Sequence, residues 1–424
     1  MDQTGLAARR TAHFILQQVT TEGRLMSEVI GAGALNDLAP DDRARAQRLA
    51  TDALRGLDRA DKMLRQHVKK APPIFVQNAL RLAVVELATD GSAHGVVNSY
   101  VEIVARNKRT EKLKGLTNAV LRKVSETAAA QWGKSAVPVM PKWLRGPLIE
   151  AWGQKAIAGV ERAHFSGAPL DLTPKTDADA VARATGGTVL PTGSVRVQEA
   201  GQVSRMSGFI EGEWWVQDAA AAMPVRLLDP QEGDRVLDLC AAPGGKTLQL
   251  AAMGTDVTAV DVSEGRMRRV QENLKRTGLT AEVIVSDAFE YQETGFDAVL
   301  LDAPCSATGT IRRHPDLPYA KDGSEFGALI GQQEAMIDHA LGLLKPGGAM
   351  VFCTCSLLPD EGEVQVEEAL GRHSDLTIDR AALDKPWIEK DWITEEGGLR
   401  FRPDYWPDIG GMDGFYMAVL RKGS

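Results

Sequence analysis

The feature that most constrains the fold is an alternation of short apolar runs with helical stretches between positions 236 and 353. Runs of three to five apolar residues are typical of buried strands, and strands that alternate with helices imply a parallel, doubly wound sheet. Ligands bind such a sheet at the carboxyl ends of its strands. The apolar runs are Val236–Leu239, Val257–Val260, Val283–Val285, Ala298–Leu301 and Ala349–Cys353.

Carboxylates stand at or near the ends of the first four runs: Asp238, Asp261, Asp287 and Asp302. One such Asp is commonly a turn former or helix cap. Four of them, together with the small-residue loop that follows Asp238, favour an adenosine-containing ligand. The loop leads into a helix expected from Lys246 to Ala252, which brings backbone amides and a helix N-terminus to the ligand.

The loop after the first strand also indicates the class of cofactor. Its residues 238–247, Asp-Leu-Cys-Ala-Ala-Pro-Gly-Gly-Lys-Thr, match neither the dinucleotide fingerprint nor the P-loop. S-adenosylmethionine is therefore favoured over NAD or ATP. Asp261 can accept hydrogen bonds from both ribose hydroxyls, and Asp287 can hold the adenine amino group. The predicted cofactor-binding residues are Cys240, Ala241, Ala242, Pro243, Gly244, Gly245, Lys246, Asp261, Asp287 and Asp302.

Two cysteines follow neighbouring predicted strands. Cys305 lies in Asp-Ala-Pro-Cys after the fourth strand, and Cys355 follows the fifth. Adjacent strands are about 4.8 Å apart, so both sulfurs can face one pocket. A thiolate that adds to carbon 6 of cytosine makes carbon 5 nucleophilic enough to accept a methyl group. A base must then remove the carbon 5 proton, and a carboxylic acid near ring N3 assists the addition.

The other readings of the cysteines are structural. Cys353 lies inside an apolar run and is interpreted as a small core residue. Cys240 is interpreted as a structural or backbone-contacting residue of the cofactor loop. Zinc is not expected, since the chain has no CxxC pair and no HxxxH partner. A reversible disulfide between Cys305 and Cys355 remains a minor alternative.

Residues 5–130 predict an all-α bundle. Apolar residues recur at three- and four-residue spacing from Leu6 to Val19 and from Leu49 to Leu64, and at least five helices are expected. Asp41 and Asp42, after Pro40, are predicted to cap the second helix, and Asp90-Gly91 to stop the third. On pattern alone, a packing or dimerisation role is an open alternative.

The middle of the chain predicts a linker and a small α+β subdomain. Residues 126–168 read as a linker followed by one or two helices. Residues 169–216 contain short β-like runs, Leu170–Leu172, Thr188–Leu190 and Val195–Val197, and one helix, Asp177–Thr185. The predicted domains are 1–130, a helical RNA-binding domain; 131–215, linker helices and a small α+β subdomain; and 216–424, an α/β Rossmann-like methyltransferase domain.

Charge and composition restrict the partners. The net charge of −8 alone argues against nucleic acid, but residues 1–133 hold 20 basic and 14 acidic residues, a net of +6 that leaves −14 elsewhere. RNA binding would need local basic patches. The sequence shows neither an apolar stretch of membrane-spanning length nor a secretory signal, and its four cysteines suit a reducing, cytoplasmic compartment. We expect no membrane partner and no metal; the oligomeric state stays open, and a monomer is compatible.

Three segments resemble the signatures of the RNA cytosine-5 methyltransferase family: residues 238–247, Asp302-Ala-Pro-Cys305-Ser and Thr354-Cys355-Ser356. Val216-Gln-Asp and Asp413-Gly-Phe-Tyr support the resemblance. The N-terminal region is similar to the NusB antitermination-factor fold, a family that binds RNA. That similarity rests on five short segments in order: Ala8-Arg9, Asp42-Arg43, Leu80-Arg-Leu, Val96-Val-Asn and Thr117–Arg122. The combination resembles bacterial 16S rRNA cytosine-5 methyltransferases over nearly the whole chain.

The resemblance implies roles for the site residues. Cys355 would be the nucleophile, Cys305 would help release the product, and Asp302 would lie beside both cofactor and base. In the DNA type of enzyme, Cys305 would carry the adduct instead. The open alternatives are the same chemistry on tRNA or 23S rRNA, and a non-catalytic antitermination or ribosome-assembly factor. Asp171 stands where the family has a basic residue, which weighs against RNA contacts by the small subdomain.

Overall fold

The computed structural model describes residues 5–89, 92–198 and 200–424, and it divides into two compact units. One unit, here called the helical unit, comprises the chain up to residue 166 together with residues 311–322. The other, called the sheet unit, comprises residues 167–310 and 323–424. Each unit is described by itself.

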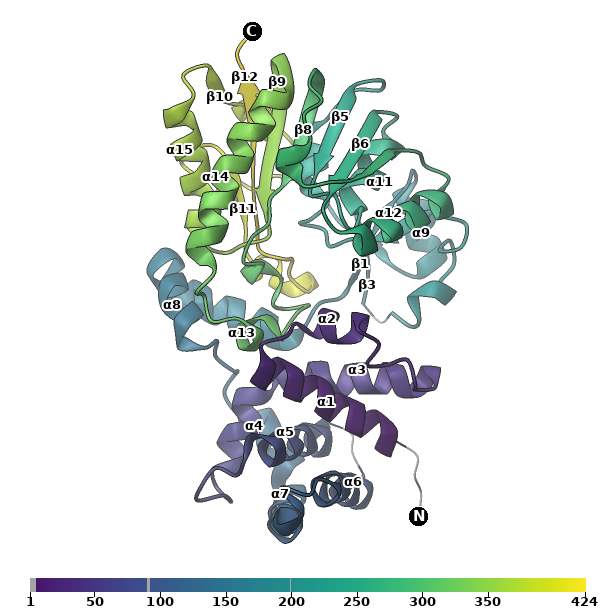
Figure 1. The fold of residues 1–424 in the computed structure, drawn as a ribbon, viewed down its shortest axis with the longest axis vertical. Coiled ribbons are helices and arrows are strands. Elements are labelled where there is room, and N and C mark those ends of the chain that lie inside the picture. Colours follow the sequence, from purple (N-terminus) through teal and green to yellow (C-terminus); the bar gives the residue numbers. More distant parts are fainter. Residues whose placement is uncertain (1–4, 90–91, 199) are drawn as a thin grey trace. The chain divides into compact units, whose positions relative to one another are not determined.

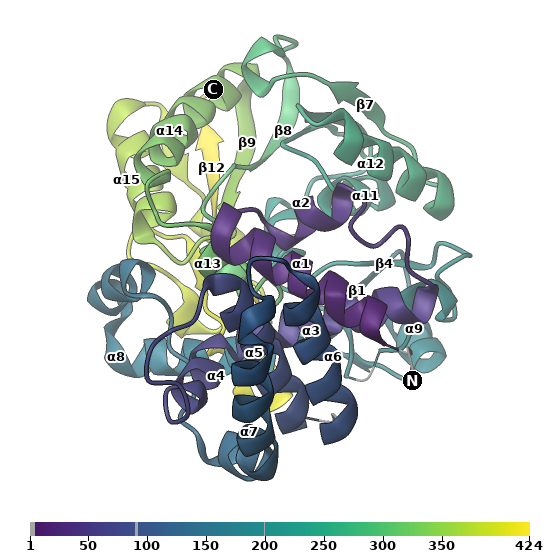
Figure 2. The ribbon, with the colours of Figure 1, turned by 60° about the horizontal axis from the view of Figure 1, so that its bottom comes forward.

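The helical unit is built around α5 (Ile74–Thr89), which is buried on nearly all sides from Val76 to Leu87. A helix that is apolar all round is stable only when others cover it, and α5 is contacted by five neighbours (Figure 2). These are α1 (Leu6–Glu22), α3 (Pro40–Arg55), α4 (Leu57–Leu64), α6 (Ala93–Arg106) and α7 (Lys114–Lys134). The short α2 (Met26–Gly31) packs on α1. The prediction of an all-α N-terminal region is confirmed.

The periodic segment from Leu49 to Leu64 contains two helices, because Gly56 separates α3 from α4. One detail of the helical prediction is wrong. Asp41 and Asp42 do not cap α3: Ala39 holds the N-cap position without a side-chain hydrogen bond, and Pro40 opens the helix. The two carboxylates lie in the first turn, where they interact favourably with the helix dipole. The predicted stop at Asp90-Gly91 lies outside the described residues.

Helix extends further along the chain than predicted. A linker was expected from residue 126, but α7 continues to Lys134. The helix extends through this stretch because it is rich in alanine, which has the highest helix propensity. α8 (Lys142–Ser166) is broken at Gly153, whose φ of 80° is not helical, so it consists of two helical segments. The prediction of one or two helices after the linker is confirmed.

Residues 311–322, here called the return segment, belong to the helical unit although they follow the Cys305 loop in sequence. The segment contains α13 (Leu317–Ala320). The backbone N–H of Met26 donates to Asp316 Oδ2 at 2.8 Å, and Arg55 Nη2 donates to the Arg312 carbonyl at 3.0 Å. No pattern in the sequence predicts this insertion.

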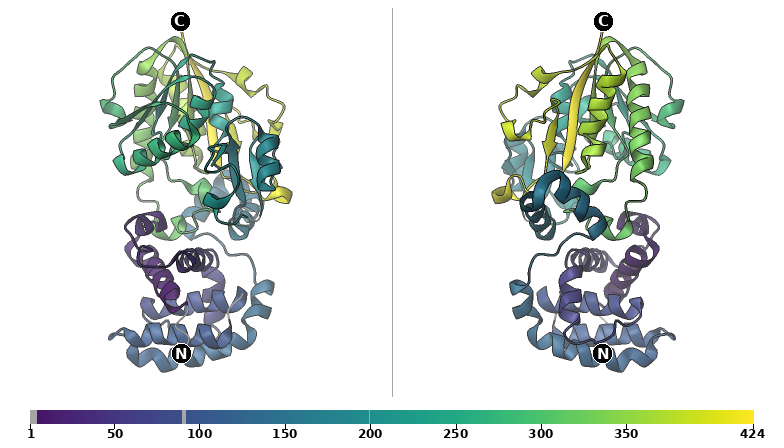
Figure 3. Two further views of the ribbon diagram at one scale, coloured as in Figure 1. Left: turned by 90° about the vertical axis from the view of Figure 1, so that its right-hand side faces the viewer. Right: turned by 90° about the vertical axis from the view of Figure 1, so that its left-hand side faces the viewer.

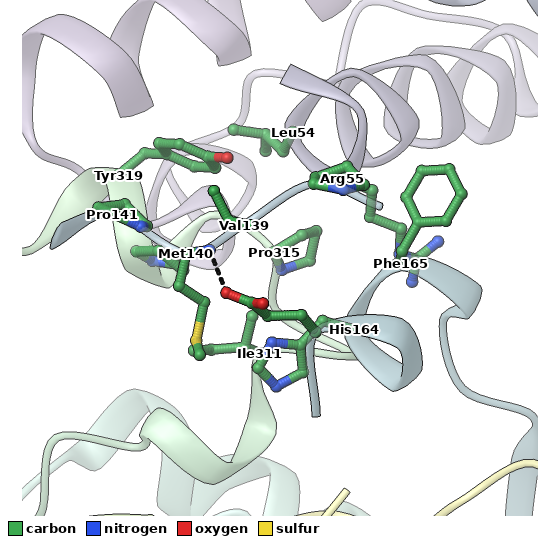
Figure 4. Close-up of a pocket in the computed structure, with 13 residues that line it drawn as sticks. Leu54, Arg55, Val139, Met140, Pro141, His164, Phe165, Ile311, Pro315 and Tyr319 are labelled. Carbon is green, nitrogen blue, oxygen red and sulfur yellow. Dashed lines mark hydrogen bonds between the residues drawn. The ribbon is translucent and has the colours of Figure 1, made fainter. Parts of the chain in front are cut away.

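A small cavity of about 40 Å³ lies between the return segment, the end of α3, the linker before α8 and the end of α8 (Figure 4). Ile311, Pro315 and Tyr319 line it from the return segment. Burial, and then the charge of Arg312, lower the pKa of His164 to about 3 on the opposite wall. The return segment therefore completes a cavity whose lining is mostly apolar but also includes Arg55 and Glu161.

The small subdomain begins the sheet unit. Its strands are β1 (Leu170–Pro174), β2 (Thr188–Val189), β3 (Val195–Val197) and β4 (Trp214–Val216), in the antiparallel order β2-β3-β1-β4, with α9 (Ala178–Thr185) beside them. The predicted α+β pattern is confirmed, with β4 as an addition.

Asp171 forms a bidentate pair with Arg196 at 2.7 Å for each bond. Both side chains are 1% exposed, so Asp171 has a structural role inside this subdomain.

The large sheet has the order β10-β12-β9-β8-β5-β6-β7, with β11 also paired to β12 (Figure 1). All five predicted strands are present and mutually parallel: β5 (Arg235–Leu239), β6 (Asp256–Asp261), β7 (Glu282–Val285), β8 (Phe296–Asp302) and β9 (Leu344–Thr354). The sheet is not wholly parallel, however. Three unpredicted antiparallel strands extend it beyond β9: β10 (Leu376–Ile378), β11 (Leu399–Phe401) and β12 (Phe415–Lys422).

Helices cover both faces of the large sheet (Figure 3). On one face, α14 (Phe326–Leu343) and α15 (Glu363–Arg372) pack on alternate residues of β5, β8 and β9. On the other face lie α10 (Met223–Leu228), α11 (Gly245–Ala252) and α12 (Glu264–Thr277). The predicted Rossmann-like α/β class is confirmed. No helix in the described part of the chain combines the length and apolar character that crossing a bilayer requires.

Candidate functional site

The loop between β5 and α11, residues 240–244, forms one wall of the site. The Ala241 N–H donates to the Val260 carbonyl at 3.0 Å, which fixes the loop against the end of β6. Gly244 has a φ of +98°, and a Cβ atom there would lie 3.0 Å from the side chain of Val270. Only glycine therefore suits this position.

Asp261, at the end of β6, connects the loop to the next helix. Its Oδ2 accepts from the Ala242 N–H at 3.2 Å and its Oδ1 from the Ser263 N–H at 2.8 Å. Arg266 Nη2 lies 3.0 Å from the same Oδ1 but is half-exposed. Asp287 is exposed after β7 and accepts from the Phe289 N–H at 2.9 Å. Both carboxylates thus lie at strand ends, as predicted.

Asp238 is fully buried beneath the loop. Its Oδ2 accepts from Thr247 Oγ1 at 2.6 Å, whereas its Oδ1 has no hydrogen-bond partner among the described residues. Burial raises the pKa of Asp238 to about 7, although the Thr247 hydrogen bond and the charge of Lys246 oppose the change. A buried carboxylate oxygen without a partner suits a ligand that brings a positive charge, such as the amino-acid part of S-adenosylmethionine.

Lys246 and Asp302 join the cofactor loop to the end of β8. Lys246 Nζ lies 2.7 Å from Asp302 Oδ2, and the Cys353 thiol donates to Asp302 Oδ1 at 3.6 Å. Burial disfavours the charged form of Lys246, but the carboxylate of Asp302 raises its pKa above the ordinary value. Lys246 therefore stays protonated, and Asp302 accepts hydrogen bonds on both oxygens.

The two predicted reactive cysteines meet. Cys305 Sγ and Cys355 Sγ are 3.5 Å apart, and both residues are half-buried. The hydrogen bond with Cys355, followed by burial and the charge of Glu361, raises the pKa of Cys305 well above that of an ordinary thiol. Cys305 therefore remains protonated, and either sulfur can be the donor in this contact. Cys353 is completely buried in the core, and burial raises its pKa.

Glu361, which the sequence analysis missed, braces the two cysteine loops. This fully buried carboxylate accepts from the Ser306 N–H at 2.9 Å and from Ser306 Oγ at 2.5 Å. Gln333 Nε2 donates to it at 3.1 Å, and the Glu361 carbonyl accepts from Thr354 Oγ1 at 2.7 Å. Ser306 follows Cys305 and Thr354 precedes Cys355, so one residue holds both loops.

Backbone contacts close the same loops together. The Gly309 N–H donates to the Cys355 carbonyl at 2.9 Å, and the Gly414 N–H donates to the Gly309 carbonyl at 2.8 Å. Any side chain at Gly309 would overlap the Gly414 backbone, so a glycine is needed here. Ser356 Oγ lies 3.2 Å from Ser306 Oγ and from Thr308 Oγ1.

The sequence could have drawn attention to Glu361 only through the short acidic segment Pro359-Asp360-Glu361 that follows Cys355. Nothing in that segment indicates that Glu361 is buried while Asp360 is exposed.

The structure brings together the cofactor loop with Asp261, Lys246 with Asp302, and Cys305 with Cys355. The catalytic and cofactor roles of these residues stay predictions. Within the residues that the structure describes, no three His, Cys, Asp or Glu side chains are grouped to hold a metal ion.

Two family models match this chain. The family described as 16S rRNA methyltransferase RsmB/F matches residues 225–421, and the NusB family matches residues 6–126. Ribosomal RNA small subunit methyltransferase B of Erwinia tasmaniensis is 34% identical over 436 residues, which cover 96% of each chain. The protein of the same name from Vibrio cholerae is 33% identical over 443 residues, covering 98% of this chain and 97% of that one.

Two solved structures share the fold. PH0851 has a TM-score of 0.76 at 22% identity and covers 98% of this chain and 99% of its own. A methyltransferase homologue from Pyrococcus horikoshii has a TM-score of 0.56 at 28% identity, covering 66% of this chain and 95% of its own. The similarity to PH0851 thus extends through both units, and at that identity it concerns the fold alone.

Proposed function

Because the chain belongs to the RsmB/F family of 16S rRNA methyltransferases, we propose that it methylates carbon 5 of a cytosine in 16S rRNA through a covalent cysteine adduct. The methyl donor is S-adenosylmethionine. The observation that carries the proposal is the 3.5 Å separation of Cys305 and Cys355 after neighbouring parallel strands. A thiol pair so placed supplies both a nucleophile and a second group for product release.

The residues that would hold S-adenosylmethionine are the 240–246 loop, Asp261 and Asp287. When bound, the cofactor supplies a methyl group on a positively charged sulfur. The half-exposed Arg266 leaves Asp261 able to accept ribose hydroxyls, and the unpartnered Oδ1 of Asp238 offers a negative partner for the amino-acid part. These features support the fit of the cofactor to this chain.

Addition to the base is assigned to Cys355. The Cys355 thiolate donates an electron pair to cytosine carbon 6, and the new S–C bond shifts the ring double bond toward carbon 5. A proton taken up from solvent and held between Asp302 and ring N3 neutralises the negative charge that develops on the ring. The protonated Cys305 thiol donates a hydrogen bond to the Cys355 sulfur and stabilises its thiolate before the attack. Carbon 5 would then donate its electron pair to the methyl group that the cofactor supplies, and the bond between that methyl group and the cofactor sulfur would break, leaving its pair on the sulfur.

Product release is assigned to Cys305. Once Cys355 is a thioether, it carries no negative charge beside Cys305. Cys305 then releases its own proton to solvent and acts as a thiolate base. It removes the carbon 5 proton, the C–H pair restores the ring double bond, and the C6–S bond breaks to return Cys355 as a thiolate.

Two cysteine variants test this division of labour. Cys355→Ala is expected to abolish transfer of tritiated methyl to 16S rRNA, with no protein–RNA adduct on a denaturing gel. Cys305→Ala is expected to accumulate such an adduct, because its release step is blocked. Normal turnover by Cys355→Ala would contradict the mechanism. Adduct formation that requires Cys305 but not Cys355 would assign the nucleophile to Cys305, as in the DNA type.

The choice of RNA is tested separately. Bisulfite sequencing of rRNA and tRNA from cells with and without the gene is expected to reveal one 16S cytosine that loses its methyl group in the deletion strain. Loss confined to tRNA or 23S rRNA would keep the chemistry and replace the substrate. If no cytosine changed and the purified chain failed to bind S-adenosylmethionine, a non-catalytic RNA-binding role would stand instead.

A further inference from the structure

Strand β4 belongs to the small subdomain, where it pairs with β1, but it also reaches the candidate cofactor site (Figure 2). Successive side chains of a strand point to opposite faces. Trp214 lies in the core of the small subdomain. Trp215 instead lies in the buried cluster that holds Ala241 and Ala242 of the cofactor loop. One strand therefore contributes to two cores.

The cluster around Trp215 is built from the elements that carry the candidate cofactor site. Its other buried members come from the cofactor loop, α11, β6 and α12: Ala241, Ala242, Leu248, Ala259, Met267, Val270 and Leu274. Among these buried residues, Trp215 alone comes from the small subdomain, and it is 3% exposed. A buried indole contributes a large apolar area, so Trp215 fixes the spacing between β4 and the cofactor loop.

Gln217, directly after β4, adds a polar junction. Its Oε1 accepts from Thr173 Oγ1 and from Trp215 Nε1, each at 2.9 Å. Its Nε2 donates to Gln249 Oε1 at 2.7 Å and to the Ala221 carbonyl at 3.1 Å. A side-chain amide has two acceptor positions and two N–H donors, so the amide of Gln217 is fully satisfied. Its hydrogen bonds therefore fix one orientation of the side chain.

The hydrogen bond to Gln249 connects β4 to α11, the helix that follows the cofactor loop. Gln249 Nε2 donates onward to the Ala222 carbonyl at 3.0 Å. Gln217 also packs on the first residue of α11, because a Cβ atom at Gly245 would lie 3.2 Å from Gln217 Cδ. The turn that carries Lys246 is thus held from the side of the small subdomain.

We infer that Trp215 and Gln217 are positioning residues for S-adenosylmethionine, through which the small subdomain holds the cofactor loop and the first turn of α11 in the shape that binds the methyl donor. The inference rests on the proposed placement of the donor at the 240–246 loop. A purely stabilising role would lower the folded fraction, which reduces kcat and leaves every KM unchanged. A positioning role raises the KM for S-adenosylmethionine, because the loop that binds it has moved.

Gln217→Glu in the full chain tests the side of the junction that faces α11. The carboxylate has nearly the same shape and still accepts from Thr173 and Trp215, but it has no N–H to donate to Gln249. We expect calorimetry to show binding of S-adenosylmethionine weakened about 10-fold, as for a buried acceptor that has lost its donor. In methyl-transfer assays the KM for S-adenosylmethionine should rise by a similar factor, whereas kcat and the KM for 16S rRNA should change less than about 2-fold.

Two neighbouring tryptophans provide matched variants. Trp215→Phe removes the bond to Gln217 and shortens a side chain in the cofactor-loop cluster. Trp214→Phe removes a comparable bond inside the small subdomain, from Nε1 to the Ser207 carbonyl at 2.9 Å. Both variants should lose unfolding free energy in urea, but only Trp215→Phe should weaken S-adenosylmethionine binding, by about 5-fold. Gln198→Glu adds the same charge at an exposed position of the subdomain and should bind as the unmodified chain does.

The outcomes separate this inference from the proposed function. Equal losses of affinity in Trp214→Phe and Trp215→Phe would show that any loosening of the subdomain disturbs the site, and unchanged affinity in Trp215→Phe would show that β4 positions nothing. Either result overturns the inference, and the tryptophan pair decides alone if Gln217→Glu does not fold. If the unmodified chain bound S-adenosylmethionine with this dependence on Trp215 but methylated no cytosine, the proposed function would fail and the inference would stand.

Discussion

The most unusual single residue in the site is Asp238, a buried carboxylate with one oxygen left without a partner among the described residues. Such a group is costly to ionise, which is why burial raises its pKa to about 7. In the unfolded chain its pKa is about 3.9. The folded state therefore binds the proton more tightly than the unfolded state, and the stabilisation that this provides is lost as the pH rises through 7.

Asp238→Asn should remove this part of the pH dependence. Without cofactor, the free energy of unfolding of the unmodified chain should fall by on the order of 3–4 kcal/mol between pH 4 and pH 8 through this residue. In the variant, the fall in unfolding free energy between pH 4 and pH 8 should be smaller by this amount. Urea unfolding at several pH values measures it. Asp256→Asn, at an exposed position, serves as control and should leave the decline as it is.

The same substitution has a consequence for the cofactor. If Asp238 receives the positive charge of S-adenosylmethionine, Asp238→Asn should weaken cofactor binding about 10-fold or more, as expected for a lost charged hydrogen bond. Calorimetry at pH 8 measures the effect. Unchanged affinity, together with the altered pH dependence of unfolding, would make Asp238 a structural residue only.

At the scale of elements, the site depends on two loops that leave parallel strands and on the brace between them. The Glu361 carboxylate accepts from the Ser306 N–H, from Ser306 Oγ and from Gln333 Nε2. In Glu361→Gln, an NH2 group replaces one accepting oxygen, so its N–H groups must point at some of these donors. We expect a loss of about 2–3 kcal/mol in unfolding free energy. A displacement of the thiols by about 1 Å costs roughly 100-fold in rate, so kcat should fall by that order while cofactor affinity stays unchanged.

The test of Glu361 also uses a milder variant and a control, so that a loss of activity can be distinguished from unfolding of the sheet unit. Ser306→Ala removes one donor and should lower kcat by a smaller factor, with near-normal stability. Asp360→Asn changes the exposed neighbour and should do neither. Methyl-transfer kinetics with cofactor affinity measured in parallel distinguish the cases. A stability loss without any change in kcat would limit Glu361 to a folding role.

The elements that the sequence predicted are those whose pattern is local. The five parallel strands are continuous apolar runs because both faces of the sheet are covered, and the reactive cysteines follow two of them directly. β12 was missed because it pairs with β9 across more than sixty positions, a relation that no local period encodes. Glu361 was missed for a similar reason: its burial is created by Ser306 and Gln333, which lie far from it in sequence.

At the scale of the whole molecule, the two units are interlaced along the chain. The helical unit is discontinuous, since the return segment at 311–322 lies between residues of the sheet unit in sequence. Nothing in a periodic pattern distinguishes such a segment from an ordinary loop, so the predicted boundaries assumed contiguous domains. Only residues 306–310 separate Cys305 from the return segment, and the anchoring of that segment is therefore expected to limit the freedom of the cysteine loop.

Asp316→Asn in the full chain tests this connection. Asp316 is 2% exposed, and its side chain accepts from the first N–H of α2. The substitution weakens this helix cap, and we expect a loss of about 1 kcal/mol in the stability of the segment. Hydrogen exchange should become faster at Met26 and across 311–322, whereas Asp37→Asn, on an exposed loop, should exchange as the unmodified chain does. With the far end of the Cys305 loop less firmly held, kcat should fall several-fold without a change in cofactor affinity. Faster exchange with unchanged kcat would mean that residues 302–310 are positioned by the brace at Glu361 alone.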